Sequence, residues 1–400
     1  MTIEVKSLTT DFLESHMVLN QGPSHPATHG TIRFILELDG ENIINCDVEI
    51  GYLHRAFEKM TEQVTWNQVI PYTDRLNYCS AMINNVGYAL AVEKLLDIIV
   101  PERCRYLRVI ISELSRIMDH MVCLGALAVD VGALTNFWYF FQAREKIYEL
   151  LEELCGSRLT TSYTRVGGLM ADAPAGWCAM AIGALPAIAS AIDDVDGLLT
   201  NNRIFIDRTR GVGPISAEDA LNSGFTGPCL RATGVDYDVR RASPYLGYDE
   251  FDFEIPTDTN GDTYSRYIIR IREMRESLKI TRQALDRITE GPVMADRPDV
   301  VLPSKDRVYN EMEALIRQFK IVYDGIQVPA GESYTCVEGA NGELGFYIVS
   351  DGSGRPYRIR VRGPCFPILS AIPAMVDGQM LADLVASFSS INVIAGELDR

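Results

Sequence analysis

The alternation of apolar and polar positions indicates β-structure near both ends of the chain. Residues 32–50 alternate on either side of Asp39-Gly40, a dipeptide that favours the tight turn of a β-hairpin. Residues 333–361 alternate again, and the turn dipeptides Asn341-Gly342 and Asp351-Gly352 separate their apolar runs. The pattern therefore predicts a small N-terminal sheet built on a hairpin, and a three-stranded antiparallel meander near the C-terminus.

Between these sheets the apolar residues recur at helical spacing, and several predicted helices are apolar on more than one face, as in a packed bundle. The capping box Ser216–Asp219 starts one short helix. Longer helices are expected at 54–67, 74–96, 101–128, 136–155, 179–199, 263–288, 304–323 and around 378–387, followed by an extended tail at 391–400. The predicted fold class is α+β, a mainly helical bundle core with small N-terminal and C-terminal antiparallel sheets.

No linker, repeat or low-complexity segment interrupts the chain, so we expect its regions to pack as one unit. These regions are an N-terminal hairpin region at 1–53, a helical core at 54–332 and a C-terminal meander and tail at 333–400. The predicted helix at 263–288 is rich in arginine and glutamate, and its charged face is interpreted as a surface exposed to solvent or to another subunit.

Composition excludes several classes of partner and site. The 400 residues include 37 basic and 54 acidic ones, and the net charge of −17 argues against nucleic acid and against docking on anionic lipid. The nine cysteines contain no C-x-x-C pair, and phosphate-binding loops, nucleophile elbows and H-E-x-x-H motifs are missing. No apolar run is long enough for a membrane span, and the N-terminus lacks the character of a targeting peptide. We expect a cytosolic protein or one on the cytosolic face of a membrane.

Two of the five histidines lie in Gln21–Gly30, a segment with two prolines and several turn-favouring residues. Proline fixes φ and removes a backbone donor, so the segment is expected to be a shaped loop, neither helix nor central strand. Such a loop can hold His25 and His29 in fixed directions toward a ligand. On this motif alone, a plain turn whose histidines bond nearby backbone is the favoured interpretation.

Three polar residues in the helical region could carry chemistry. Tyr78 lies near the start of a predicted helix, where its phenol either donates to a ligand or is a core aromatic residue. Asp130 follows an apolar run, where a carboxylate needs a partner; it either pairs with His120 or caps the next segment. Arg55 has helical spacing to Glu58, which alone indicates a surface ion pair.

Motifs throughout the chain define a family resemblance. They are Gly22–Gly30, Gly51–Lys59, Pro71–Tyr78, Leu90–Lys94, Glu113–Arg116, Arg165–Gly168 and Tyr347–Gly352. In this order they resemble the D (49-kDa-type) subunit of bacterial respiratory complex I, the proton-pumping NADH:quinone oxidoreductase. The resemblance implies a fold like the large subunit of nickel–iron hydrogenases. The hydrogenase thiolate positions are occupied by Asn77 and Ser80, and the C-terminal tail has no sulfur, so the nickel ligands are missing.

The resemblance implies that the former metal cavity is the head of a quinone site. His29 and Tyr78 would hydrogen-bond the quinone headgroup and supply protons on its reduction to quinol, and Asp130 would couple to His29. Arg55 would lie beside a terminal 4Fe–4S cluster held by a neighbouring subunit. No metal is expected on this chain, and NAD is expected to bind elsewhere in the complex.

The same resemblance implies partners and a location. The expected partners are the C (30-kDa-type), B (terminal-cluster), I (ferredoxin-like) and H (membrane) subunits, without nucleic acid and without a membrane span in this chain. The expected location is peripheral, on the cytoplasmic face of the bacterial inner membrane. Two alternatives stay open: the large subunit of a membrane-bound hydrogenase, and a structural scaffold in the same assembly whose histidine loop is only a turn.

Two positions depart from the family pattern. Thr160 stands where many members carry a histidine near the cluster, which makes a low-potential quinone such as menaquinone a hypothesis. Asn392-Val393 stands where Asp-Pro is usual, and only local repacking is expected there.

Overall fold

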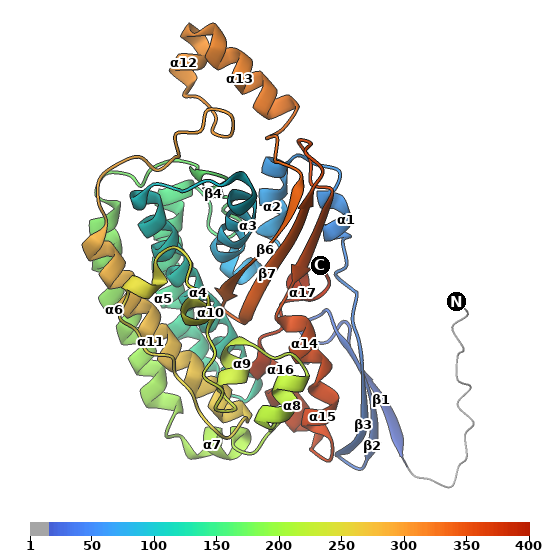
Figure 1. The fold of residues 1–400 in the computed structure, drawn as a ribbon. Helices are drawn as coiled ribbons and strands as arrows, with labels where there is room; N and C mark the ends of the chain where they lie inside the picture. The colour runs from blue at the N-terminus through green and yellow to red at the C-terminus, as the bar shows by residue number, and fades with distance from the viewer. Residues whose placement is uncertain (1–15) are drawn as a thin grey trace, which may run out of the picture.

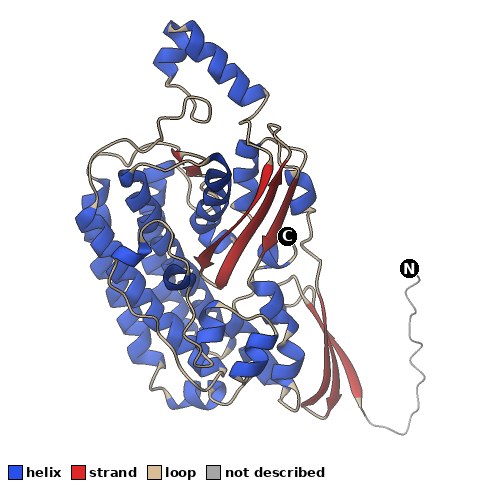
Figure 2. Cartoon of the chain, viewed as in Figure 1, coloured by secondary structure: helices blue, strands red, loops and turns tan. Residues whose placement is uncertain are grey.

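The computed structural model describes residues 16–400, and the N-terminal residues considered above for a targeting peptide lie outside that range. A helical bundle forms one side of the molecule, and two separate three-stranded sheets lie along the other side (Figure 1). The strands are confined to those two sheets and one short two-stranded pair, while helices make up most of the described chain (Figure 2). The structure therefore confirms the predicted α+β class.

The N-terminal sheet has the order β1-β2-β3 and is antiparallel throughout. Strands β2 (Arg33–Asp39) and β3 (Asn42–Glu49) form the predicted hairpin around Asp39-Gly40. β1 (Met17–Gln21) was not predicted and adds an edge strand next to β2. Alternate β2 side chains, from Phe34 to Leu38, are buried and join a core cluster with the C-terminal helices.

The bundle is organised around its longest helix. The bundle helices are α3 (Ala81–Leu96), α4 (Glu102–Asp130), α5 (Leu134–Cys155), α6 (Trp177–Leu199) and α11 (Thr263–Arg287). α4 contacts α3, α5 and α11, and nearly all of its side chains from 104 to 128 are buried. Because α4 is covered on several sides, it can place buried polar side chains at several points along the core.

The expectation that no apolar run reaches membrane-spanning length does not hold for α6, which is long and apolar enough to cross a membrane by length and composition. In this structure it contacts α5 and α11 and contributes Trp177, Ile188 and Val195 to the bundle core. Only 28% of its most apolar window is buried within the chain.

The C-terminal sheet consists of β6 (Gly331–Gly339), β7 (Gly342–Ser350) and β8 (Arg358–Arg362), as the turn dipeptides predicted. It packs on α3, where Gly87 permits close contact: a Cβ there would lie 3.0 Å from atoms of Val337 and Phe346.

The remaining elements are shorter. They are η1 (Pro26–Thr28), α1 (Phe57–Thr61), η2 (Trp66–Val69), α2 (Ile70–Thr73), η3 (Tyr78–Ser80), β4 (Thr164–Arg165), β5 (Gly168–Leu169), α7 (Arg203–Thr209), α8 (Ala217–Asn222), α9 (Gly227–Arg231), α10 (Val239–Ala242), η4 (Tyr248–Glu250), α12 (Lys305–Asn310), α13 (Met312–Tyr323), α14 (Cys365–Ser370), α15 (Ile372–Val376), α16 (Leu381–Ile391) and α17 (Ala395–Leu398). α12 and α13 project from the body of the molecule (Figure 1).

Two predicted helices at and before α3 were confirmed only in part. The stretch 54–67 contains only α1, because the Thr65 backbone N–H donates to Gln68 in a capping box that starts a new turn at η2. The stretch 74–96 becomes helical only at Ala81. Asn77 accepts the Cys79 backbone N–H and thereby holds a separate 3-10 turn, η3, in front of the helix.

Two further predictions near the C-terminus were wrong in part. The stretch 304–323 is divided at Glu311, whose extended backbone separates α12 from α13. The predicted helix at 378–387 begins and ends later, as α16, and Asn392 terminates it in the left-handed conformation with φ 56°. The tail after it is not extended, because it contains α17. Most of its side chains are buried.

Candidate functional site

The histidine loop, Gln21–Gly30, is held by its own buried residues. Thr28 is fully buried, and its hydroxyl donates to the carbonyls of Pro23 at 3.3 Å and His25 at 3.0 Å. Gly22 has φ +97°, and a Cβ there would lie 2.1 Å from the Ile32 carbonyl oxygen, so the position requires glycine. The loop is shaped as predicted, except that it contains one 3-10 turn, η1, which begins at a proline.

The two histidines of this loop have different surroundings. His25 caps η1 by accepting the Ala27 backbone N–H on Nδ1 at 3.2 Å, so it supports the loop. His29 ends the turn in the left-handed region with φ 51°. Its ring lies 5.1 Å from the Phe388 ring, and its Nε2 lies 3.8 Å from Asp130 Oδ2. The fold therefore brings His29 against a carboxylate from another element.

Asp130 is the last residue of α4, where the helix leaves the bundle core. Its Oδ2 also accepts a hydrogen bond from the Ser389 hydroxyl on α16. The alternative partner considered from the sequence, His120, is wrong. His120 is fully buried, and its Nε2 lies 2.8 Å from Glu273 Oε2. The partner of Asp130 among the histidines is His29.

Tyr78 is the first residue of η3 and is half-buried. It packs against the core cluster that also contains Phe388. Burial raises the pKa of Tyr78 to about 12, with smaller contributions from nearby Cys79, Cys365 and Asp119. The phenol is therefore protonated at neutral pH and can donate a hydrogen bond.

Arg55 does not form the ion pair with Glu58 that its spacing indicated. The Glu58 carboxylate instead lies 3.0 Å from Arg360 and accepts the Val361 backbone N–H on β8. The exposed Arg55 guanidinium donates to the Arg75 carbonyl oxygen at 2.8 Å, three residues before Tyr78. This arrangement leaves a cation at the surface beside the Tyr78 turn.

The C-terminal tail closes this side of the site. Asp399 accepts the backbone N–H groups of Gly51 at 3.0 Å and Leu53 at 2.8 Å. Glu397 is fully buried and accepts the Cys365 backbone N–H at 2.9 Å. Burial raises the pKa of Glu397 to about 7. The tail thus holds the backbone at 51–53, immediately before Arg55, in place.

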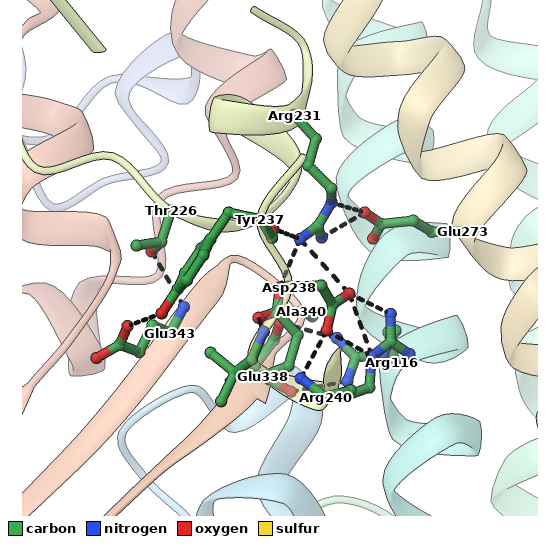
Figure 3. Close-up of polar contacts among 12 residues, drawn as sticks. Arg116, Thr226, Arg231, Tyr237, Asp238, Arg240, Glu273, Glu338, Ala340 and Glu343 are labelled. Carbon is green, nitrogen blue, oxygen red and sulfur yellow. Dashed lines mark hydrogen bonds and ion pairs between the residues drawn. The ribbon is translucent and has the colours of Figure 1, made fainter. Parts of the chain in front are cut away.

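A network of buried ion pairs joins α4, α11 and β6 (Figure 3). Arg231 lies 2.5 Å from Glu273 and 2.9 Å from Glu338, and Arg116 donates to the backbone carbonyls of Glu338 and Gly339. Arg240 bridges Asp238 and Glu113. Charges without access to water must be paired in this way.

This network contradicts part of the prediction that the charged face of 263–288 is exposed. Arg272 is exposed and Arg275 pairs with Asp193 near the surface, as predicted. Arg266, Arg270 and Glu273 are buried, and Arg270 Nη1 donates to His120 Nδ1 at 3.1 Å. Because Nδ1 accepts this bond, His120 is neutral and donates its Nε2–H to Glu273. Burial lowers the pKa of His120, and the adjacent Arg231 and His120 hold the pKa of Glu273 well below its usual range despite its burial.

The sequence interpretation missed three residues that contact the predicted site: Phe388 and Ser389 on α16, and Asp119 on α4. One signal was present in the sequence. Ser387, Ser389 and Ser390 interrupt an otherwise apolar helical run. Within residues 16–400, no group of three or more His, Cys, Asp or Glu side chains is arranged to hold a metal ion.

Comparison with known proteins defines the class first. The chain is 53% identical over 384 residues to the D subunit of the Myxococcus xanthus NADH-quinone oxidoreductase, covering 96% of this chain and 92% of that protein. It is 53% identical over 398 residues to the D 1 subunit of the same enzyme in Sorangium cellulosum, covering 99% and 98%. The C/D subunit of Bdellovibrio bacteriovorus is 51% identical over 387 residues, covering 97% of this chain and 69% of that longer protein.

These relatives are subunits of an oxidoreductase complex, and the family model that matches residues 130–400 agrees with them. That model describes the 49-kDa subunit of the respiratory-chain NADH dehydrogenase. The chain belongs to this family, the D subunits of NADH-quinone oxidoreductase.

Proposed function

We propose that this chain forms the quinone-headgroup site of its complex, with His29 and Tyr78 as the hydrogen-bond and proton donors. The observation that carries the proposal is the approach of His29 Nε2 to Asp130 Oδ2, at 3.8 Å. Nothing in the local sequence of the loop requires a carboxylate there, and an Asp–His pair is a standard means of orienting an imidazole for proton transfer.

Reduction of a quinone to a quinol consumes two electrons and two protons. Tyr78 is suited to hydrogen-bond a quinone oxygen because its raised pKa keeps the phenol protonated. His29 is suited because its ring is partly exposed, at 32%, while Phe388 and Asp130 fix its direction. Each group can be reprotonated from water after donating, since neither is sealed in the core.

The electrons would come from a 4Fe–4S cluster held by a neighbouring subunit. Arg55 is exposed beside the Tyr78 turn, and a cation there would stabilise the extra negative charge of the reduced cluster. NAD would bind on another subunit. We place the chain among the C, B, I and H subunits, peripherally on the cytoplasmic face of the inner membrane. The Bdellovibrio relative, which joins C and D in one chain, supports the first of these neighbours.

The test uses His29→Ala in the assembled complex. Quinone reductase activity is compared with NADH oxidation by ferricyanide, an acceptor that bypasses the quinone. We expect the quinone-linked rate to fall by about 100-fold, the usual contribution of a positioned acid, with the ferricyanide rate kept. His25→Ala is the matched control and should have a smaller effect. Equal quinone-linked rates for wild type and His29→Ala would favour the scaffold alternative.

A further inference from the structure

A buried carboxylate links the two sides of the proposed quinone site, which are the Tyr78 turn and the end of α16 next to His29 and Asp130. Asp119 on α4 is fully buried, and within residues 16–400 it forms no ion pair with a basic side chain. Its Oδ2 accepts hydrogen bonds from Asn77 Nδ2 at 2.7 Å and Ser80 Oγ at 2.8 Å. Its Oδ1 accepts from Asn392 Nδ2 at 2.7 Å. Three neutral donors therefore surround this one carboxyl group.

The orientation of both amides is set by backbone groups. Asn77 Oδ1 accepts the Cys79 backbone N–H at 3.1 Å, so its NH₂ group must face Asp119. Asn341 Nδ2 donates to the Asn392 carbonyl at 3.0 Å, so its Oδ1 accepts from Asn392 Nδ2 at 2.6 Å. Asn392 therefore also presents an NH₂ group. Asp119 must accept on both oxygens, which a neutral amide of the same shape cannot do.

The donors belong to the two sides of the site. Asn77 caps η3 immediately before Tyr78, and Ser80 is the last residue of η3. Asn392 terminates α16, the helix that carries Phe388 against the His29 ring and Ser389 against Asp130. We propose that Asp119 is a positioning residue that fixes the Tyr78 turn relative to the His29–Asp130 pair. This inference rests on the proposed quinone site.

The tail packs tightly where these sides meet. A Cβ on Gly396 would lie 2.3 Å from the Arg75 carbonyl oxygen and 2.5 Å from that of Leu76, so α17 touches the backbone that leads into η3. A shift of the Tyr78 turn would therefore also disturb the tail. Through Asn77 and Ser80 on one side and Asn392 on the other, Asp119 keeps the Tyr78 turn and the start of the tail in fixed positions relative to each other.

The test is a swap of donor and acceptor in the assembled complex, with decylubiquinone as the probe. In Asp119→Asn, either orientation of the new amide places its NH₂ against the NH₂ of Asn77 or of Asn392. Adding Asn77→Asp removes the clash, because the carboxylate introduced at position 77 still accepts the Cys79 N–H and also accepts from the amide introduced at position 119. Ser80 can turn its hydroxyl to accept, and the Oδ1 of the introduced amide keeps the bond from Asn392.

We expect Asp119→Asn to raise the KM for decylubiquinone by about tenfold, the effect of one buried mispaired group, with ferricyanide reduction retained. The double variant should return the KM to within about twofold of wild type. Asp262→Asn is the matched control, since Asp262 is also buried and accepts the Gly211 and Ser265 backbone N–H groups away from Tyr78. Its KM should not change.

A wild-type KM in Asp119→Asn, or a double variant that is no better than the single one, would overturn the positioning role. If Asp119→Asn does not assemble, the double variant alone decides, because only restored pairing predicts both assembly and a normal KM. Tyr78→Phe separates the two proposals. Loss of quinone reduction in Tyr78→Phe with none in Asp119→Asn rejects only the positioning role. Normal rates in both variants reject the quinone site itself.

Discussion

His29 and Asp130 are far apart in the sequence, yet His29 Nε2 lies 3.8 Å from Asp130 Oδ2, on the carboxylate oxygen that also accepts from Ser389. The contact joins the N-terminal loop to the end of the central bundle helix. The charge of the Asp130 carboxylate and the direction from which it meets the His29 ring both act on the partly exposed imidazole. Changing either should therefore change the proposed delivery of protons by His29.

Asp130→Asn is expected to lower the quinone-linked turnover by about tenfold, equivalent to about 1.4 kcal/mol of transition-state stabilisation. The amide removes the negative charge and can present either oxygen or nitrogen to His29, so the ring loses its single orientation. Turnover with quinone and with ferricyanide is measured on the same preparation. Asp286→Asn, which alters an exposed i,i+4 pair, is the control. Unchanged turnover in Asp130→Asn would reject the role of the contact.

Glu273→Gln should strongly reduce assembly of the complex. Glu273 Oε1 accepts from Arg231 and Oε2 pairs with His120, all of them fully or almost fully buried. Removing one member of a buried ion network typically costs about 3–5 kcal/mol, because the opposite charge loses its partner. The amount of this subunit in purified membranes measures the effect. The exposed pair altered by Asp286→Asn is worth about 1 kcal/mol at most, so that variant should assemble normally. Normal assembly of Glu273→Gln would contradict this prediction.

The protonation of Glu397 should make the C-terminal tail pH-sensitive. Burial raises its pKa from 4.5 to about 7, so the folded tail binds a proton more tightly than the unfolded tail does. The resulting stabilisation is fully present below pH 4.5 and is lost as pH rises through 7, at about 1.4 kcal/mol per pKa unit.

Hydrogen exchange of the Cys365 amide, which donates to Glu397, reports this stability. Corrected for the intrinsic exchange rate, protection in the assembled complex should fall as pH rises toward 7.5, approximately half a unit above the folded pKa. Glu397→Gln should remove the pH dependence, since the amide does not titrate. Protection that is constant with pH in the wild type would contradict the assignment.

Thr160 bears on the identity of the quinone. Under the proposed function, a 4Fe–4S cluster of a neighbouring subunit lies near Thr160. A threonine has no group that titrates near neutrality, so the potential of that cluster should vary little with pH, as suits a low-potential quinone such as menaquinone. Redox titration of the terminal cluster at several pH values measures this. Thr160→His should introduce a pH dependence. A strong shift in the wild type would contradict the expectation.

Periodicity predicted the two sheets and the bundle, because their burial follows regular spacing that the sequence carries locally. The same spacing failed at α11. Arg266, Arg270 and Glu273 are charged, and their burial depends on partners such as His120 and Arg231 from distant segments. No local pattern distinguishes a charge facing water from one paired in the core.

The helices predicted at 54–67 and at 74–96 were wrong in part, for a related reason. Separate turns start there because the side chains of Gln68 and Asn77 each accept a backbone N–H, from Thr65 and from Cys79. Asn77 also donates to Asp119 across the core. For the site, the local sequence around Asp130 indicated His120 as one candidate partner. Only the family resemblance implied a coupling to His29, since nothing within either segment encodes their approach.

The central claim is that Tyr78 and His29 both serve the quinone. It is tested most directly by Tyr78→Phe, which removes one hydroxyl and leaves the ring in its core contacts. The kcat for quinone reduction by the assembled complex, measured beside NADH:ferricyanide activity, should fall by about 100-fold while the ferricyanide rate is unchanged. A kcat equal to that of the wild type in a fully assembled complex would contradict the proposed site.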